Sequence, residues 1–194
     1  MKKAAMFGLD ARIALAIFGA LSVISGAALY SAIQQAKTTA LITELNELGK
    51  ALEQYYLDVG SYPARMGSDN TVADYYAFKS LALVTNDGKA GWNGPYYAAS
   101  ELRTNQFRNV RGEDVWFAQY KTGDWSSYTS GQCTTGLTCG LWVRLWQDPR
   151  GLTDSQIASL DKTLDNSDGA SKGKLRWDAN SINYLYSVSQ NPND

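Results

Sequence analysis

The strongest constraint on this chain is an uncharged stretch near its start, residues 13–36. A helix of that length would rise roughly 36 Å, and the hydrocarbon core of a bilayer is about 30 Å thick. Because Lys2, Lys3 and Arg12 precede the stretch, we expect the N-terminus to stay in the cytoplasm and the rest of the chain to lie outside. The sequence therefore predicts a membrane-spanning helix.

The helical pattern continues beyond the uncharged stretch. Apolar residues recur every three or four positions, at Leu41, Leu45, Leu48, Leu52 and Tyr55/Tyr56. Charged residues such as Glu44 fall largely on the other sides, and Gly60 and Pro63 end the pattern. A secretory signal peptide also has a basic start and an apolar run, but its apolar region is shorter and is followed by unrelated sequence. We therefore predict one helix, apolar and then amphipathic, over about residues 10–58.

The composition limits the functions that are open to this chain of 194 residues. Its net charge of −1 provides no basic surface for nucleic acid, and it lacks histidine, the commonest general base and zinc ligand. The sequence contains no phosphate-binding glycine-rich loop, and its serines have no histidine that could activate them as nucleophiles. We therefore predict no specific nucleic-acid binding and no enzyme activity, and one compact domain with an appendage.

Three short segments carry a resemblance to a known family. They are "MFGLD" (6–10), the helix exit "YYLDVGSYP" (55–63) and "GWNGPYY" (91–97). Together with the long N-terminal helix, these segments resemble type IV pilins and type II secretion pseudopilins. The resemblance implies a leader peptide of residues 1–5, a helix of residues 6–58 with about 11–36 in the membrane or filament core, and a globular head of residues 59–194.

The resemblance also implies proteolytic processing. A prepilin peptidase would cut after Ala5, which makes Met6 the first mature residue and Asp10 the fifth, where the family usually has Glu. The family usually carries Gly before the cut, so a cut after Gly8 stays open, and it would make Asp10 the second residue. In the first register, Asp10 is the candidate assembly residue.

An acid at Asp10 needs a physical reason, because an ionised carboxylate in hydrocarbon costs several kcal/mol unless it is paired. The resemblance implies that Asp10 meets the new α-amine of a neighbouring subunit as helices bundle into a filament. Arg12 is a competing partner, although residues two apart on a helix do not face each other. Alternatively, both charges simply lie among the lipid headgroups at the membrane edge.

The function that the resemblance implies is structural. The chain would be a subunit of a type IV pilus or pseudopilus, with copies of itself, prepilin peptidase and the inner-membrane assembly machinery as partners. It would be held in the inner membrane as a precursor with a periplasmic head, and then enter an extracellular pilus or a periplasmic pseudopilus. Two alternatives stay open: a minor pseudopilin, and an unprocessed single-pass membrane protein whose head binds a ligand.

The head contains all six Trp and several strand-like runs. These runs cover residues 115–121, 141–147, 173–178 and 181–189. Residues 178–180 would turn the last two runs into a hairpin, and Thr153 can cap a helix that extends to about Leu164. The predicted fold class is α+β and pilin-like, with the long N-terminal helix packed on a small antiparallel sheet.

Cys133 and Cys139 are the only cysteines, with five residues between them in a stretch rich in Gly, Ser and Thr. A zinc site would need further Cys or His ligands, which the sequence does not provide. We therefore predict a disulfide that closes a small loop, provided that the compartment is oxidising. Two independent thiols are the alternative.

A run of acidic residues follows the predicted helix of the head. Asp161, Asp165, Asn166 and Asp168 are hard oxygen donors of the kind that calcium prefers. Their spacing is not that of an EF-hand, and it departs from the glycine- and aspartate-rich C-terminal loop that holds calcium in major pseudopilins. Asp161, Asp165 and Asp168 are therefore a candidate calcium site, with a solvated turn as the alternative, and we expect no other cofactor.

Overall fold

The computed structural model describes residues 3–69 and 73–191. The chain forms two compact units, Met1–Ala40 and Leu41–Asp194. Helix α1, Lys3–Val59, contributes residues to both units. The predicted fold class is confirmed, because the chain combines a long apolar N-terminal helix with an open antiparallel sheet.

Most of the described side chains of the first unit are exposed to solvent. Every described side chain from residue 10 to residue 33 is exposed. Among the described helices, Asp10–Val59 within α1 is long and apolar enough to cross a membrane, a test that a signal sequence near an N-terminus would also pass. The described part of this unit therefore has no apolar core of its own.

The second unit is built on a seven-stranded antiparallel sheet with the order β2-β3-β4-β5-β7-β6, and β1 pairs with β4. The long strands are β4 (Asp114–Lys121), β5 (Cys139–Trp146) and β7 (Ser181–Ser189). The short strands are β1 (Ala77–Phe78), β2 (Glu101–Leu102), β3 (Phe107–Arg108) and β6 (Leu175–Trp177). Three 3₁₀ turns connect them, at Ala73–Tyr76, Ser80–Leu83 and Tyr128–Ser130.

The four predicted strands are confirmed as β4, β5, β6 and β7, and β6 and β7 form the predicted hairpin. Strands β1, β2 and β3 were not predicted, because two residues are too few to show a period of two. The predicted second helix is confirmed as α2, Asp154–Asp165. Thr153 caps it by accepting a hydrogen bond from the Gln156 backbone N–H, and Asn166 ends it in the left-handed conformation.

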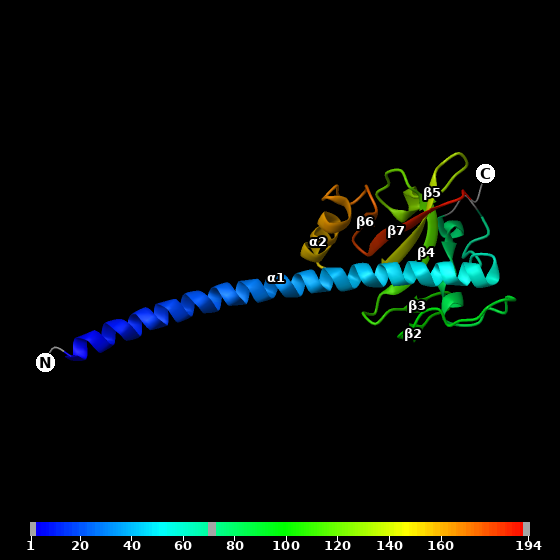
Figure 1. Cartoon of the computed structure of the whole chain (residues 1–194). Coiled ribbons are helices and arrows are strands. Elements are labelled where there is room, and N and C mark those ends of the chain that lie inside the picture. The colour runs from blue at the N-terminus through cyan, green and yellow to red at the C-terminus, as the bar shows by residue number, and fades with distance from the viewer. Residues whose placement is uncertain (1–2, 70–72, 192–194) are drawn as a thin grey trace. The chain divides into compact units, whose positions relative to one another are not determined.

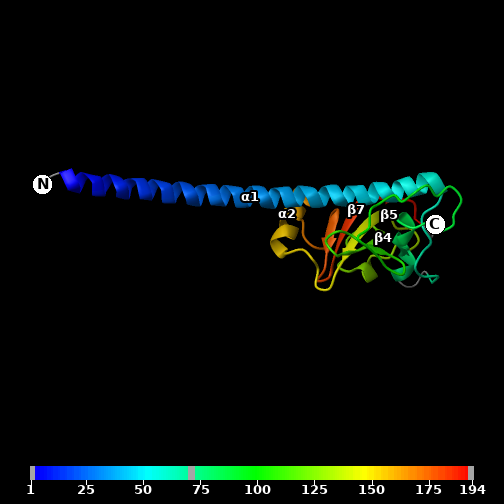
Figure 2. The same ribbon diagram turned by 90° about the horizontal axis from the view of Figure 1, so that it is seen from below.

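Residues 41–59 of α1 cover one face of the sheet (Figure 1). Figure 2 shows the same arrangement from below, with the strands on a single side of this part of the helix. The predicted apolar stripe is buried at Leu41, Leu45, Leu48, Leu52 and Tyr55, whereas Tyr56 is exposed. The stripe packs against alternate residues of the strands, among them Phe117, Val143 and Ile182. This contact forms the main core of the head.

The opposite face of the sheet carries a second, smaller core. Residues that alternate with the first set, such as Tyr120 and Trp142, are buried there together with Trp125 and the two cysteines. The guanidinium carbon of Arg176 lies 4.7 Å from the Trp142 ring centroid and 4.9 Å from that of Trp125. The head therefore buries apolar side chains on both faces of its sheet.

Candidate functional site

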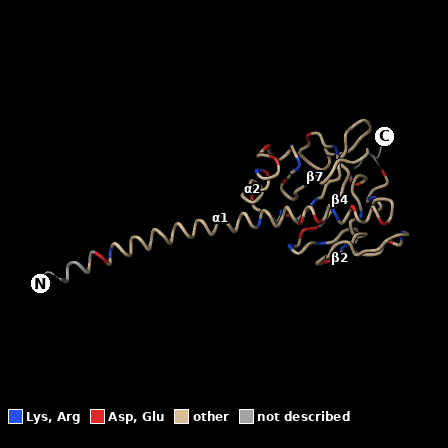
Figure 3. Tube along the Cα trace, viewed as in Figure 1, with Lys and Arg blue, Asp and Glu red and all other residues tan. Residues whose placement is uncertain are grey.

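The N-terminal part of α1 is the first candidate site, because it combines apolar exposure with two charges. Figure 3 shows the uncharged stretch that follows Asp10 and Arg12 along the helix. Asp10 and Arg12 are exposed, and no ion pair within the described residues includes Asp10. Ala5 and Met6 have helical backbone, and their side chains lie outside the described part. The structure therefore supplies no partner for Asp10 within its own described chain.

A polar network joins the amphipathic half of α1 to the loop before β4. Glu44 forms an ion pair with Arg111 and accepts hydrogen bonds from Asn109 Nδ2 at 2.9 Å and from the Tyr97 hydroxyl at 3.4 Å. Arg111 also pairs with Glu113, at 2.6 Å between Nη2 and Oε2. Burial, followed by the charge of Glu44, raises the pKa of Tyr97 to about 12. Glu44, which the sequence places on a side of the helix away from the apolar stripe, is half-buried in this network.

The "GWNGPYY" segment packs against the C-terminal end of α1. The indole N–H of Trp92 donates to the Ala82 carbonyl at 2.8 Å, and the Tyr96 hydroxyl donates to the Asp58 carboxylate at 3.0 Å. Gly91 has a φ of +87°, and a Cβ at this position would lie 2.1 Å from the Asp58 carbonyl oxygen. Only glycine fits this close approach. The segment is therefore a loop with aromatic anchors, as its turn residues predicted.

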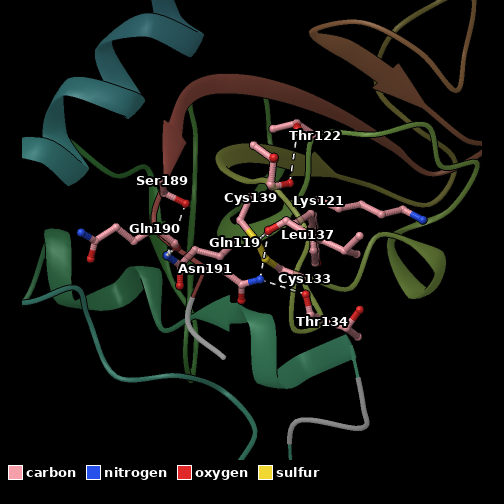
Figure 4. The surroundings of a disulfide bond; sticks show 12 residues. Gln119, Lys121, Thr122, Cys133, Thr134, Leu137, Cys139, Ser189, Gln190 and Asn191 are labelled. Carbon is pink, nitrogen blue, oxygen red and sulfur yellow. Dashed lines mark hydrogen bonds between the residues drawn. A yellow bond between two sulfur atoms is a disulfide. The ribbon is translucent and has the colours of Figure 1, made fainter. Parts of the chain in front are cut away.

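Cys133 and Cys139 are joined by a disulfide with a Cα–Cα distance of 5.8 Å (Figure 4). Both residues are buried in the second core of the head. The Asn191 amide donates to the carbonyl oxygens of Thr134 and Leu137, at 2.9 and 3.0 Å, and so ties the chain beyond β7 to the disulfide loop. The cross-link thus holds the loop between β4 and β5 against the sheet.

Replacing both Cys133 and Cys139 by Ser is expected to lower the free energy of unfolding by about 2 kcal/mol, because closing a short loop restricts the unfolded chain. Thermal unfolding of the full chain in detergent measures this effect. As a control, a reductant should lower the Tm of the wild type and leave that of the double variant unchanged. Equal Tm values for the two proteins under oxidising conditions would contradict the prediction.

The structure brings Asp161, Asp165 and Asp168 together at the C-terminal end of α2. One carboxylate oxygen of each residue lies within 4.8 Å of an oxygen of the other two. Asp161 is buried, Asp165 is half-buried and Asp168 is exposed. The three residues named from the sequence therefore form one cluster.

A cavity of about 390 Å³ lies on the sheet face opposite α1, and the sequence did not indicate it. Arg144 is 7% exposed there, and its guanidinium carbon lies 4.2 Å from the Tyr128 ring centroid. Within the described chain, Arg144 Nε and Trp116 Nε1 are buried without a hydrogen-bond partner. A cation and two free N–H donors among aromatic rings suit a small ligand with acceptor oxygens. The cavity is lined by Asp74, Gln106, Trp116, Tyr128, Arg144 and Trp146.

Comparison with known families finds a match over part of the chain. Residues 28–110 match the family model "Type II secretion system (T2SS), protein G". The resemblance to pseudopilins is confirmed. No curated protein and no solved structure matches the chain. Pseudopilins are in general structural proteins rather than enzymes.

The pseudopilin match includes some of the features described above and leaves out others. The matched residues include the amphipathic half of α1 and the "GWNGPYY" segment. They also include Tyr97 and Asn109, which donate hydrogen bonds to Glu44, but not Arg111. Asp10 precedes residue 28, and the disulfide, α2 and the acidic cluster follow residue 110. The match therefore covers the part of the chain in which the amphipathic half of α1 contacts the loops before β4. It does not extend to the charged start of α1 or to the part of the head that follows residue 110.

Proposed function

We propose that this protein is a pseudopilin-type filament subunit of a type II secretion system, which polymerises through the N-terminal part of α1. The pseudopilin match over residues 28–110 supports the secretion system. The exposure of the apolar start of α1 supports polymerisation and is the observation that carries the proposal.

The apolar surface at the start of α1 is too large to stay in water. Exposed patches of more than a few hundred Å² mark binding surfaces, and each large apolar side chain gains about 1.5–3 kcal/mol on burial. Lipid would cover this surface in the precursor, and copies of the same helix would cover it in the filament. The exposed large side chains of this segment are Ile13, Leu15, Ile17, Phe18, Leu21, Val23, Ile24, Leu29, Tyr30 and Ile33.

The proposal gives Asp10 and the cut N-terminus complementary roles. Prepilin peptidase removes residues 1–5, and the new α-amine of Met6 then neutralises Asp10 of a neighbouring subunit. The pair has no net charge. Two paired charges are tolerated in a medium of low dielectric constant, where a single unpaired charge is not. Asp10 has no ion-pair partner among the described residues, which leaves its carboxylate available for this contact.

The proposal also specifies where the protein is located before and after assembly. The basic N-terminus holds the precursor in the inner membrane with the head in the periplasm. The inner-membrane assembly machinery then lifts processed subunits into the pseudopilus, whose outer surface is the head. A disulfide in the head agrees with an oxidising compartment.

Sedimentation and the intact mass of the native protein test this function. We expect native protein to sediment as fibres, and its intact mass to correspond to a chain that starts at Met6. A mass that places Leu9 first would contradict the role of Asp10, because Asp10 would then be the second residue. Single molecules that retain residues 1–5 would contradict the filament itself.

A second candidate function is ligand binding by the head of an unprocessed, single-pass membrane protein. The cavity with the buried Arg144 and the unpaired Trp116 indole favours this function. The same experiment separates the two functions, since unprocessed single molecules would support the second. A minor pseudopilin shares the anchor with the main subunit, and the number of copies per filament distinguishes the two.

A further inference from the structure

The sheet face opposite α1 carries a buried positive charge beside a cavity. Arg144 of β5 is 7% exposed, and it lines the cavity of about 390 Å³ described above. Its partners in register on the two neighbouring strands are Trp116 of β4 and Asn183 of β7, and neither carries a charge. A buried guanidinium without a counter-charge is costly, because burial removes the water that would otherwise solvate it. Packing alone therefore does not explain Arg144.

The carboxylates of the described chain do not neutralise this charge. Within the described residues, no ion pair includes Arg144, and its Nε is buried without a hydrogen-bond partner. Asp114 lies on the same face of the sheet, but it pairs with Arg108 at 2.9 Å between Oδ1 and Nε. Asp74 lines the cavity and is exposed. Arg144 is therefore a cation without a bound counter-ion in the described chain.

Three aromatic residues line the cavity together with Arg144. They are Trp116 of β4, Tyr128 of the 3₁₀ turn Tyr128–Ser130, and Trp146 of β5. The guanidinium carbon of Arg144 lies 4.2 Å from the Tyr128 ring centroid. All three aromatic residues are half-buried, so part of each side chain is accessible. Accessible aromatic rings around a few polar groups are typical of ligand sites.

Two polar side chains complete the lining of the cavity. Asp74 belongs to the 3₁₀ turn Ala73–Tyr76, and Gln106 immediately precedes β3. A carboxylate accepts hydrogen bonds, whereas an amide both donates and accepts them, and a hydroxyl group can bind to either. The cavity therefore offers aromatic rings, hydrogen-bonding groups of both kinds and one buried positive charge.

We propose that this cavity binds the pyranose ring of an acidic sugar, a hexuronate, whose carboxylate pairs with Arg144. The C–H groups on the faces of a pyranose ring carry small positive charges, and they pack well on the negative faces of aromatic rings. The hydroxyl groups of the sugar suit Asp74 and Gln106, and its carboxylate supplies the counter-charge that Arg144 lacks. The volume of the cavity lies within the range of about 300–1,000 Å³ that is usual for small-molecule sites.

Other anions use fewer of these groups. A phosphate ion has no apolar face for the aromatic rings, and it would bind to a single arginine. An acidic peptide would bring several carboxylates close to Asp74, which would repel them. A hexuronate has one carboxylate, several hydroxyl groups and an apolar face, so it matches the charge, the polar groups and the rings at once.

This inference rests on ligand binding by the head, which is the second candidate function above. It applies to processed and unprocessed chains alike, because all residues that line the cavity lie in the head. Four of them, Trp116, Tyr128, Arg144 and Trp146, follow residue 110 and so lie beyond the pseudopilin match. The site is therefore a feature of this chain's own C-terminal part.

Titration with a matched pair of sugars tests the site. Methyl β-D-glucuronide and methyl β-D-glucoside differ only in one group, a carboxylate in the first and a hydroxymethyl group in the second. The full chain is kept in lauryldimethylamine oxide, because detergents with sugar head groups would compete. We expect isothermal titration and Trp fluorescence to detect one site, with a Kd at least about tenfold lower for the glucuronide than for the glucoside.

Arg144→Gln separates recognition of the charge from a structural role of the arginine. The folded variant, verified by near-ultraviolet circular dichroism, should bind the two sugars equally, because only the glucuronide loses a charged contact. Trp146→Leu should weaken the binding of both sugars alike, by about three- to tenfold, since it removes an aromatic ring. Arg150→Gln makes the same change as Arg144→Gln at a residue that does not line the cavity, and it should bind as the wild type does.

The results that overturn the proposal are distinct from those that concern the filament. The proposal is overturned if the wild type binds neither sugar, or binds the glucoside as tightly as the glucuronide; neither result depends on a variant that folds. Equal weakening of both sugars by Arg144→Gln would overturn the pairing of the carboxylate with Arg144. Binding of benzoate but of neither sugar would overturn the sugar and retain ligand binding by the head. Fibres in the same preparation report on assembly separately.

Discussion

Replacing Asp10 by Lys or Ala is expected to abolish filament assembly and to leave membrane insertion intact. Either change leaves the α-amine of the neighbouring subunit in an apolar bundle without its counter-charge, at a cost of about 3–5 kcal/mol per contact. That cost lowers the association constant by a factor of roughly 10²–10⁴. Insertion depends on the apolar stretch that follows, which neither change alters. Sedimentation of fibres and alkaline extraction of membranes measure the two properties separately.

Two matched variants identify the partner of Asp10. Asp10→Glu keeps the negative charge and should assemble, whereas Arg12→Gln tests whether the partner is the arginine of the same helix. We expect Arg12→Gln to form fibres, because residues two apart point to different sides of a helix. Normal fibre yield from Asp10→Lys would show that the two charges only lie among the headgroups. Loss of fibres in Arg12→Gln would assign the pairing role to Arg12.

Replacing Leu48 by Ala is expected to lower the free energy of unfolding of the head by about 3 kcal/mol. Leu48 is 0% exposed in the core between α1 and the sheet, so truncation removes apolar contacts and leaves a cavity. For a chain of this size the Tm should fall by about 10 °C. Thermal unfolding of the full chain in detergent, followed by near-ultraviolet circular dichroism of the Trp-rich head, measures the change.

Leu57→Ala is the control for this prediction, because it makes the same chemical change on the same helix. Leu57 is 73% exposed, so its loss should change the free energy of unfolding by less than about 0.5 kcal/mol. Equal destabilisation by the two substitutions would mean that residues 41–59 do not pack on the sheet through the face that contains Leu48. A normal Tm for Leu48→Ala would contradict the core as described.

The local features of this fold could be predicted because each is encoded by residues that are close in sequence. The stripe from Leu41 to Tyr55 has a helical period, and Thr153 has the side chain of a helix cap. The alternation of Leu141, Val143 and Leu145 with bulkier residues indicated β5. Strands β1, β2 and β3 could not be predicted, because their two residues pair only where the neighbouring strand is already in place.

The candidate sites show the same division between local and long-range information. The sequence named Asp161, Asp165 and Asp168 by their chemistry, and it could not show that Asp161 is buried with an unpaired oxygen. The cavity around Arg144 and Trp116 was missed, since its residues come from different strands and turns. The sequence offered one signal for it, which is that Arg144 alternates with Trp142 and Trp146 in a predicted strand.

The sequence by itself determined that this protein contains an apolar helical segment, an amphipathic continuation of that helix and an antiparallel sheet. Periodicity, caps and the absence of charge are properties of neighbouring residues, so they can be read without knowing the fold. Only the tertiary structure decided that Glu44 pairs with Arg111 and that the Tyr184 hydroxyl donates to Asn46 at 3.0 Å. Such contacts join residues far apart along the chain, and no period in the sequence specifies which distant residue will be the partner.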